Sequence, residues 1–113
     1  MTEFVWSWPT RADSVVPDVT SGLAKCTKYT MAINHETYRW AAKRLPVRGV
    51  ADGIALRFDA SIDGDSSDVV LYVAYLVRGG TVLDLEASGE RITDAVFTQL
   101  VSKAAARLNA AVD

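Results

Sequence analysis

The last third of the chain, from Asp68 to Asp113, restricts the fold more than any other part of the sequence. Val69–Arg78 is apolar on both faces, as a central strand of a sheet is, and Gly79-Gly80 supplies the glycines that a tight hairpin turn requires. Thr81–Ala87 alternates apolar and polar residues, and Thr93–Val112 carries an apolar stripe at helical spacing. The block therefore predicts a β-hairpin followed by one long amphipathic helix.

The first two thirds of the chain predict one more helix and further strands. Phe4–Trp8 alternates large and small residues, and Thr10–Thr27 has apolar residues three and four positions apart. Because proline is tolerated only in a first helical turn, the regular helix should start between Ser14 and Pro17. Later alternation predicts strands at Tyr29–Ile33, Tyr38–Lys43 and Ile54–Ile62.

The strand at Ile54–Ile62 shows the cleanest alternation in the chain. Its even-numbered residues are apolar and should face the core, whereas its odd-numbered residues should face water. The odd-numbered set is Ala55, Arg57, Asp59 and Ser61. In the same way Asp84 and Glu86 are expected to face water, opposite Leu83, Leu85 and Ala87. The residues Asp63 to Asp68 read as a polar turn.

These elements predict a single α+β domain over residues 1–113, in the order β-α-β-β-β-β-β-α. Consecutive strands joined by short turns must be antiparallel. We expect a twisted antiparallel sheet of about five to six strands, with both helices packed on one face. A chain of this length can bury a core without a disulfide or metal.

The composition argues against a nucleic-acid-binding surface and against a membrane-spanning helix. The net charge is −2 and the basic residues are scattered, whereas a nucleic-acid surface needs clustered Lys and Arg. The one local cluster, Arg39, Lys43, Arg44 and Arg48, is better explained as a solvated strand face than as a phosphate or anionic-lipid site. No apolar run approaches the roughly 20 residues of a membrane helix.

Localisation depends on the start of the chain. Met1-Thr2-Glu3 lacks the positive charge of a signal peptide, and no apolar segment follows. A native start at Met1 would therefore predict a cytoplasmic protein, and a trimmed signal would leave an extracytoplasmic one. Cys26 is the single cysteine, so an intramolecular disulfide is excluded.

An acidic segment around Gly64 suggests calcium, but its spacing does not fit. Counted from Asp59, an EF-hand loop would place Val70 at its twelfth position, where a glutamate is needed. A solvated hairpin turn explains the four carboxylates Asp59, Asp63, Asp65 and Asp68 better, and we predict no metal site.

No catalytic group stands out either. His35 is the single histidine and lies in a predicted turn, and Cys26 falls on the buried stripe of the first helix. Asp84 and Glu86 share a strand face without an opposed carboxylate across a cleft. We predict a protein that is not an enzyme and uses no cofactor.

Aromatic residues gather in the first 40 positions and give the candidate binding site. Trp and Tyr beside an arginine are natural anchors for a ligand or partner, and they are equally at home in a core. Both interpretations stay open for this set, whose candidate site residues are Trp6, Trp8, Tyr38, Arg39 and Trp40.

Four stretches together resemble a family of actinobacterial exported proteins. They are Leu23–Tyr29, Val47–Gly53, Tyr75–Leu85 and the closing helix segment Ala104–Leu108. The chain resembles the extracellular sensor domains of PknH-type receptor serine/threonine kinases and their secreted or lipoprotein relatives. Those domains carry paired disulfides and a longer N-terminus, whereas Cys26 stands alone. The resemblance implies a sensor-like, extracytoplasmic module that binds a ligand or partner, and it implies no catalytic residue.

The expected function is thus non-enzymatic binding of an unknown protein or small molecule. The alternative is a cytoplasmic protein–protein interaction or immunity-type protein, which acts by occluding its partner. Self-association into a homo-oligomer is expected if a trimmed upstream half leaves a sheet edge exposed.

Overall fold

The computed structural model describes residues 2–7, 12–25, 28–33, 36–50, 52–62, 65–89 and 92–112. Within these residues, six strands and two α-helices are present in the predicted order, with a short 3₁₀ turn, η1 (Ala12–Ser14), ahead of the first helix. The elements are β1 (Thr2–Ser7), α1 (Val15–Lys25), β2 (Lys28–Ile33), β3 (Glu36–Leu45), β4 (Asp52–Ile62), β5 (Asp65–Arg78), β6 (Thr81–Ser88) and α2 (Asp94–Val112). The α+β class and the antiparallel sheet with two helices are therefore confirmed.

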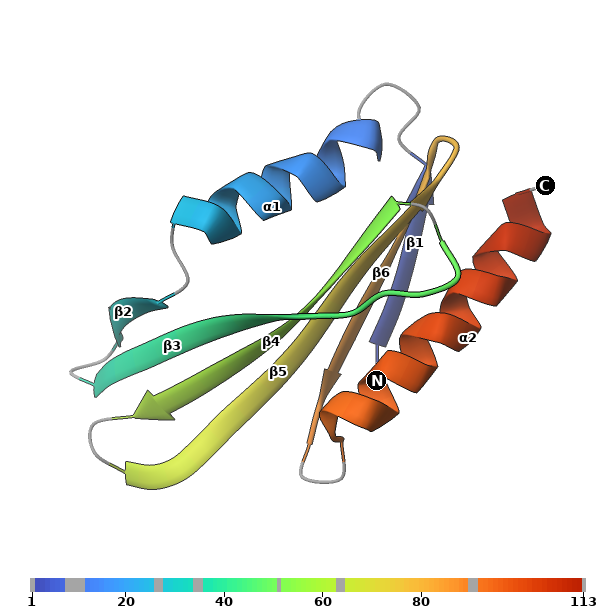
Figure 1. Ribbon diagram of the computed structural model, residues 1–113. Helices are drawn as coiled ribbons and strands as arrows, with labels where there is room; N and C mark the ends of the chain where they lie inside the picture. Colours follow the sequence, from blue (N-terminus) through green and yellow to red (C-terminus); the bar gives the residue numbers. More distant parts are fainter. Residues whose placement is uncertain are drawn as a thin grey trace.

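The sheet has the strand order β1-β6-β5-β4-β3-β2, and every neighbouring pair is antiparallel. Short hairpins join β2 through β6 in sequence, so these strands lie side by side as they follow one another. Strands β1 and β2 form opposite edges of the sheet, and α1 lies between them in the chain. Figure 1 shows α1 above the sheet on the path from one edge to the other.

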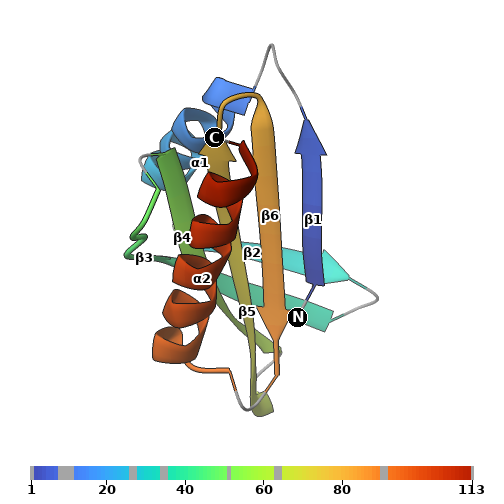
Figure 2. The same ribbon diagram turned by 90° about the vertical axis from the view of Figure 1, so that its right-hand side faces the viewer.

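The prediction that both helices share one face is wrong. Helix α1 packs on Ile54, Leu56 and Val82, whereas α2 packs on Ala55 and Leu83, their neighbours in the strands. Successive residues of a strand point to opposite faces, so the two helices cover opposite sides of the sheet. Figure 1 shows the sheet passing between them, and Figure 2 shows α2 in front of the strands.

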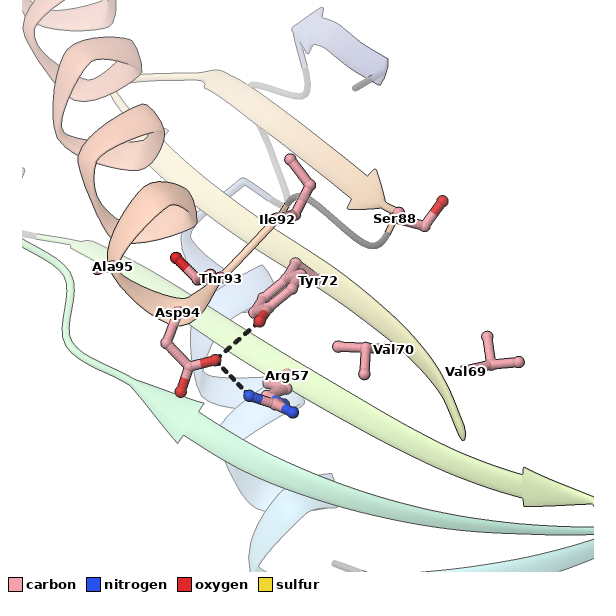
Figure 3. Close-up of a pocket in the computed structure, with 10 residues that line it drawn as sticks. Arg57, Val69, Val70, Tyr72, Ser88, Ile92, Thr93, Asp94 and Ala95 are labelled. Carbon is pink, nitrogen blue, oxygen red and sulfur yellow. Dashed lines mark hydrogen bonds and ion pairs between the residues drawn. The ribbon is translucent and has the colours of Figure 1, made fainter. Parts of the chain in front are cut away.

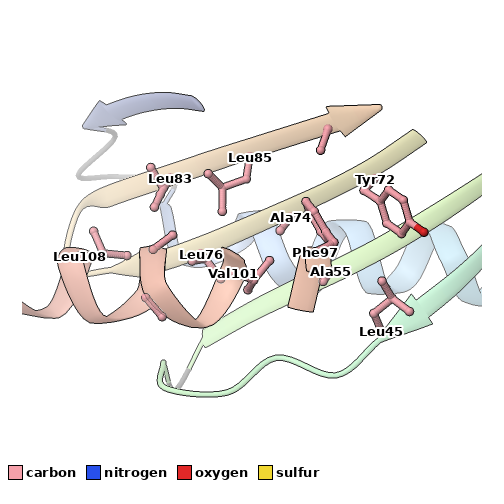
Figure 4. Close-up of a cluster of buried hydrophobic side chains, with 13 residues drawn as sticks. Leu45, Ala55, Tyr72, Ala74, Leu76, Leu83, Leu85, Phe97, Val101 and Leu108 are labelled. Atoms are coloured by element: carbon pink, nitrogen blue, oxygen red, sulfur yellow. The ribbon is translucent and has the colours of Figure 1, made fainter. Parts of the chain in front are cut away.

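The larger core lies between α2 and strands β4, β5 and β6. Phe97 and Val101 of α2 are fully buried there, as are Ala74, Leu76 and Leu85 of the sheet (Figure 4). At the far end of α2, Arg78 donates to the Asn109 side chain at 2.8 Å, and Asn109 donates to the Gly49 carbonyl oxygen at 2.7 Å. Polar contacts therefore fix this end of the helix to β5 and to the loop before β4.

The smaller core lies under α1, whose apolar stripe follows the predicted spacing. Val16 is buried, Val15, Val19 and Leu23 pack beside it, and Pro17 occupies the first turn as expected. We predicted that the face of β4 with Ala55 is exposed to solvent. Because α2 covers that face, Ala55 is buried, with 1% of its surface exposed. That part of the prediction is wrong for the same reason as the helix placement.

Residues 65–68 of the predicted polar turn belong to a strand, whereas Asp63 and Gly64 lie outside the described residues. β5 begins at Asp65, and Asp65 pairs with Ile62 across a two-residue connection, with an irregular register before Val69. Aspartate and serine have low strand propensity, but pairing with β4 outweighs that preference here. The strand thereby extends past the end of β6, and this extension borders the site described next.

Candidate functional site

A hollow of about 750 Å³ lies where β6 ends and α2 begins. The chain leaves the sheet after Ser88, turns at Gly89 with a φ of 132°, and starts the helix at Asp94. A positive φ of this kind is readily adopted only by glycine. Figure 3 shows the lining of what we call the α2 hollow, which consists of Arg57, Val69, Val70, Tyr72, Ser88, Gly89, Ile92, Thr93, Asp94 and Ala95.

Arg57 of β4 supplies the positive charge of the α2 hollow and binds two carboxylates. Its Nε and one terminal nitrogen donate to Asp59, two residues along the same strand face, at 3.1 and 2.9 Å. Its other terminal nitrogen donates to Asp94 at 2.7 Å, which ties β4 to the start of α2. Such charge-assisted contacts orient the planar guanidinium firmly.

Asp94, in the first turn of α2, accepts hydrogen bonds from side chains of three strands. Its Oδ1 accepts from Arg57 and also from the Tyr72 hydroxyl of β5, at 2.8 Å (Figure 3). Its Oδ2 accepts from the exposed Lys43 of β3 at 3.5 Å. Thr93 caps the helix by accepting from the Val96 N–H, and a carboxylate in a first turn suits the helix dipole. We call Arg57, Tyr72 and Asp94 the polar clasp.

Aromatic contacts link the polar clasp to the core. The Tyr72 ring stacks on Phe97 with centroids 5.0 Å apart, and the Arg57 guanidinium lies 5.9 Å from the Tyr72 ring centroid. Tyr72 is 1% exposed, so its ring belongs to the α2 core while its hydroxyl reaches the hollow. Buried packing thus fixes the Tyr72 member of the clasp, to which the partly exposed Arg57 and Asp94 are joined.

The contacts of the clasp move each of its pKa values away from neutrality. The bond to Asp59, then that to Asp94, raises the pKa of Arg57. Burial, and then the bond to Asp94, raises the pKa of Tyr72. The bonds from Tyr72 and Arg57 lower the pKa of Asp94. At neutral pH the clasp is therefore a fixed set of one cation, one anion and one neutral hydroxyl.

The aromatic residues proposed from the sequence do not form one surface. Trp6 lies in β1 and Tyr38, Arg39 and Trp40 lie in β3, with three strands between them in the sheet order. Trp8 lies outside the described residues. Tyr38 and Trp40 are half-buried on the face that carries α1, whereas the exposed Arg39 lies on the opposite face.

The other candidate residues also separate. Cys26, His35 and Asp63 lie outside the described residues, and Asp65 and Asp68 are part of β5. Asp84 does not face open water as expected, because its Oδ1 is buried and has no hydrogen-bond partner within the described part of the chain. Burial, and then Glu86, raises the pKa of Asp84. In that part no three His, Cys, Asp or Glu side chains come together as metal ligands.

Sequence reasoning placed no function on Arg57, Tyr72 or Asp94. Two signals were present: Arg57 and Asp59 are opposite charges on one strand face, and Tyr72 carries the only hydroxyl between Val69 and Ala74 in a strand that is otherwise apolar there. Neither signal identifies Asp94 as their partner, because 37 positions separate it from Arg57 along the chain.

The fold and the α2 hollow together define an α+β protein with an antiparallel sheet, one helix on each face, and an open hollow at the end of one helix. No protein-family model, curated protein or solved structure matches the chain. Across the described residues, neither helix has the length and apolar character that crossing a membrane demands.

Proposed function

We propose that this chain is a non-enzymatic binding module that holds its ligand in the α2 hollow. The observation that carries the proposal is a volume of about 750 Å³ lined by apolar side chains of β5 and of the segment before α2, by the polar clasp, and by Ser88 and Thr93. Ligand sites in proteins commonly have about 300–1,000 Å³ and this division between apolar walls and a few orienting polar groups.

The chemistry of the clasp supports binding over catalysis. General acid–base catalysis works best with groups that titrate near the working pH. The pKa values of Arg57 and Tyr72 are raised and that of Asp94 is lowered, so all three are moved further from neutral pH. These groups are suited to orienting a ligand through hydrogen bonds instead of exchanging protons with it.

A fragment screen followed by the methyl NMR signals of Val70 and Ile92 tests this proposal, since both side chains line the α2 hollow. The blocking variant is Ala95→Trp, because Ala95 is exposed on α2 and its enlarged side chain would fill the hollow. The matched control is Ala106→Trp, an exposed position further along the same helix. Fragments should bind the wild type and the control but not Ala95→Trp; fragments that bind all three equally would disprove the site.

The resemblance to receptor-kinase sensor domains supplies the biological setting that we propose, an extracytoplasmic module that senses its ligand. It is supported by the four sequence stretches alone. Mapping the natural start of the gene provides the test, because an upstream export signal or membrane anchor is expected. A natural start at Met1 would favour instead the cytoplasmic interaction or immunity-type protein.

A second candidate, a partner-binding surface, rests on Tyr38 and Trp40. Both are half-buried on one face of β3, next to the edge strand β2. Trp and Tyr are enriched among the residues that anchor partners in protein interfaces. Trp40→Ala should leave urea unfolding nearly unchanged if the tryptophan serves a partner. A large loss of stability would assign Trp40 to the core and remove this candidate.

A further inference from the structure

The charges around the α2 hollow balance within the described residues. Two cations, Arg57 and Lys43, and two carboxylates, Asp59 and Asp94, are joined by ion pairs of 2.7, 2.9 and 3.5 Å. An additional ion entering the hollow would lose part of its hydration and would meet no uncompensated opposite charge among the described residues. The cost of removing a charge from water is recovered only when such a partner is available.

The same cluster still offers hydrogen-bond donors. An arginine has five N–H groups. The contacts of Arg57 use the Nε hydrogen and one hydrogen on each terminal nitrogen, which leaves one N–H on each terminal nitrogen without a partner among the described residues. Arg57 lines the hollow and its side chain is 30% exposed, so a ligand can approach these donors.

Balanced charge and remaining donors together select a ligand class. We propose that the α2 hollow takes an apolar molecule bearing an uncharged carbonyl group, such as an amide or ester, in preference to an anion or a cation. The carbonyl oxygen accepts from Arg57, and the apolar body lies against Val69, Val70 and Ile92. This inference rests on the proposed function, because it concerns the occupant of the same site.

Three probes with the same six-carbon chain test the head-group preference: hexanamide, hexanoate and hexylammonium. Each is titrated at neutral pH while the methyl signals of Val70 and Ile92 are followed. Hexanamide should bind severalfold more tightly than either ion. In Asp59→Asn, Arg57 loses one compensating charge and hexanoate should gain affinity relative to hexanamide.

The matched control is Asp18→Asn, which removes the same charge from an exposed position on α1, across the sheet from the hollow. It should leave the order of the three probes unchanged. Tighter binding of hexanoate or hexylammonium than of hexanamide to the wild type would overturn the ligand class while leaving the proposed function in place. If none of the probes shifts the hollow's methyl signals although fragments of the screen do, the ligand class is wrong and the proposed function stands; if neither probes nor fragments shift them, both proposals fail.

Discussion

Each face of the sheet is covered by one helix, but the ionisable side chains on the two faces differ in their hydrogen-bond partners. On the α2 face, Arg57, Asp59 and Asp94 pair with one another and Tyr72 joins them. On the α1 face, the Asp84 carboxylate has a buried oxygen without a hydrogen-bond partner within the described part of the chain. Pairing stabilises ionised groups, whereas unpaired burial destabilises them. The α2 face is therefore the one on which the ionisable side chains have fixed partners.

The helices that cover the two faces also differ in length. Helix α2 has 19 residues and reaches from the polar clasp to Asn109, so it is fixed at both ends. Helix α1 has 11 residues and covers a smaller group of buried side chains. More buried area under α2 means a larger hydrophobic contribution to stability from that face.

The largest effect should come from removing the central side chain of the α2 core. Phe97 is fully buried and stacks on Tyr72, so Phe97→Ala should lower the free energy of unfolding by about 3–5 kcal/mol. Its counterpart on the other face, Val16→Ala, should cost about 1–2 kcal/mol. Urea unfolding of both variants measures the contrast. Equal losses would show that the two faces contribute alike and would contradict the comparison.

A second, smaller effect is expected from opening the polar clasp. Asp94→Ala removes the acceptor of both Arg57 and Tyr72, and charge-assisted hydrogen bonds at partly exposed sites contribute about 1–3 kcal/mol. Because the pKa of Asp94 is lowered by folding, its contribution is fully present above the unfolded value of 3.8 and is lost as the pH falls through the folded value.

Unfolding measured from neutral to acidic pH tests this dependence. The wild type should lose stability on acidification below the unfolded pKa of Asp94, and Asp94→Ala should lose less over the same range. Asp18→Ala, on the exposed side of α1, is the control for removing one carboxylate. Parallel pH curves for the wild type and Asp94→Ala would show that the clasp does not contribute through its charge.

The sequence predicts the elements of this fold well and their placement less well. Hairpin turns and alternation are local signals, so the strands from Tyr29 onwards and the helix from Asp94 follow from neighbouring residues. The face on which a helix packs depends on the crossover path, which local patterns do not encode. One clue did exist, because a strand that is apolar on both faces, as at Val69–Val77, needs a cover on both.

The candidate site was harder to predict than the fold. Its residues come from β4, β5 and the start of α2, and only the tertiary structure brings Arg57, Tyr72 and Asp94 together. The aromatic residues drew attention because their types are distinctive, but the sheet order separates Trp6 from Trp40. Residue type indicates what a side chain can do, whereas long-range contacts decide which side chains act together.

The smallest effect, and the one of opposite sign, is expected on the α1 face. Burial and Glu86 raise the pKa of Asp84 in the folded protein, so the ionised form is disfavoured by folding. The contribution of Asp84 to stability is then greatest below its unfolded pKa of 3.8 and is lost as the pH rises through its folded pKa, opposite in sign to the contribution of Asp94. Asp84→Asn removes the charge at similar size and should stabilise the protein at neutral pH by about 1 kcal/mol or less. A matched Glu86→Gln variant should gain less, because Glu86 has no buried oxygen without a partner among the described residues. If Asp84→Asn instead destabilises the protein at neutral pH, the Asp84 carboxylate is satisfied in solution, and the contrast between the two faces disappears.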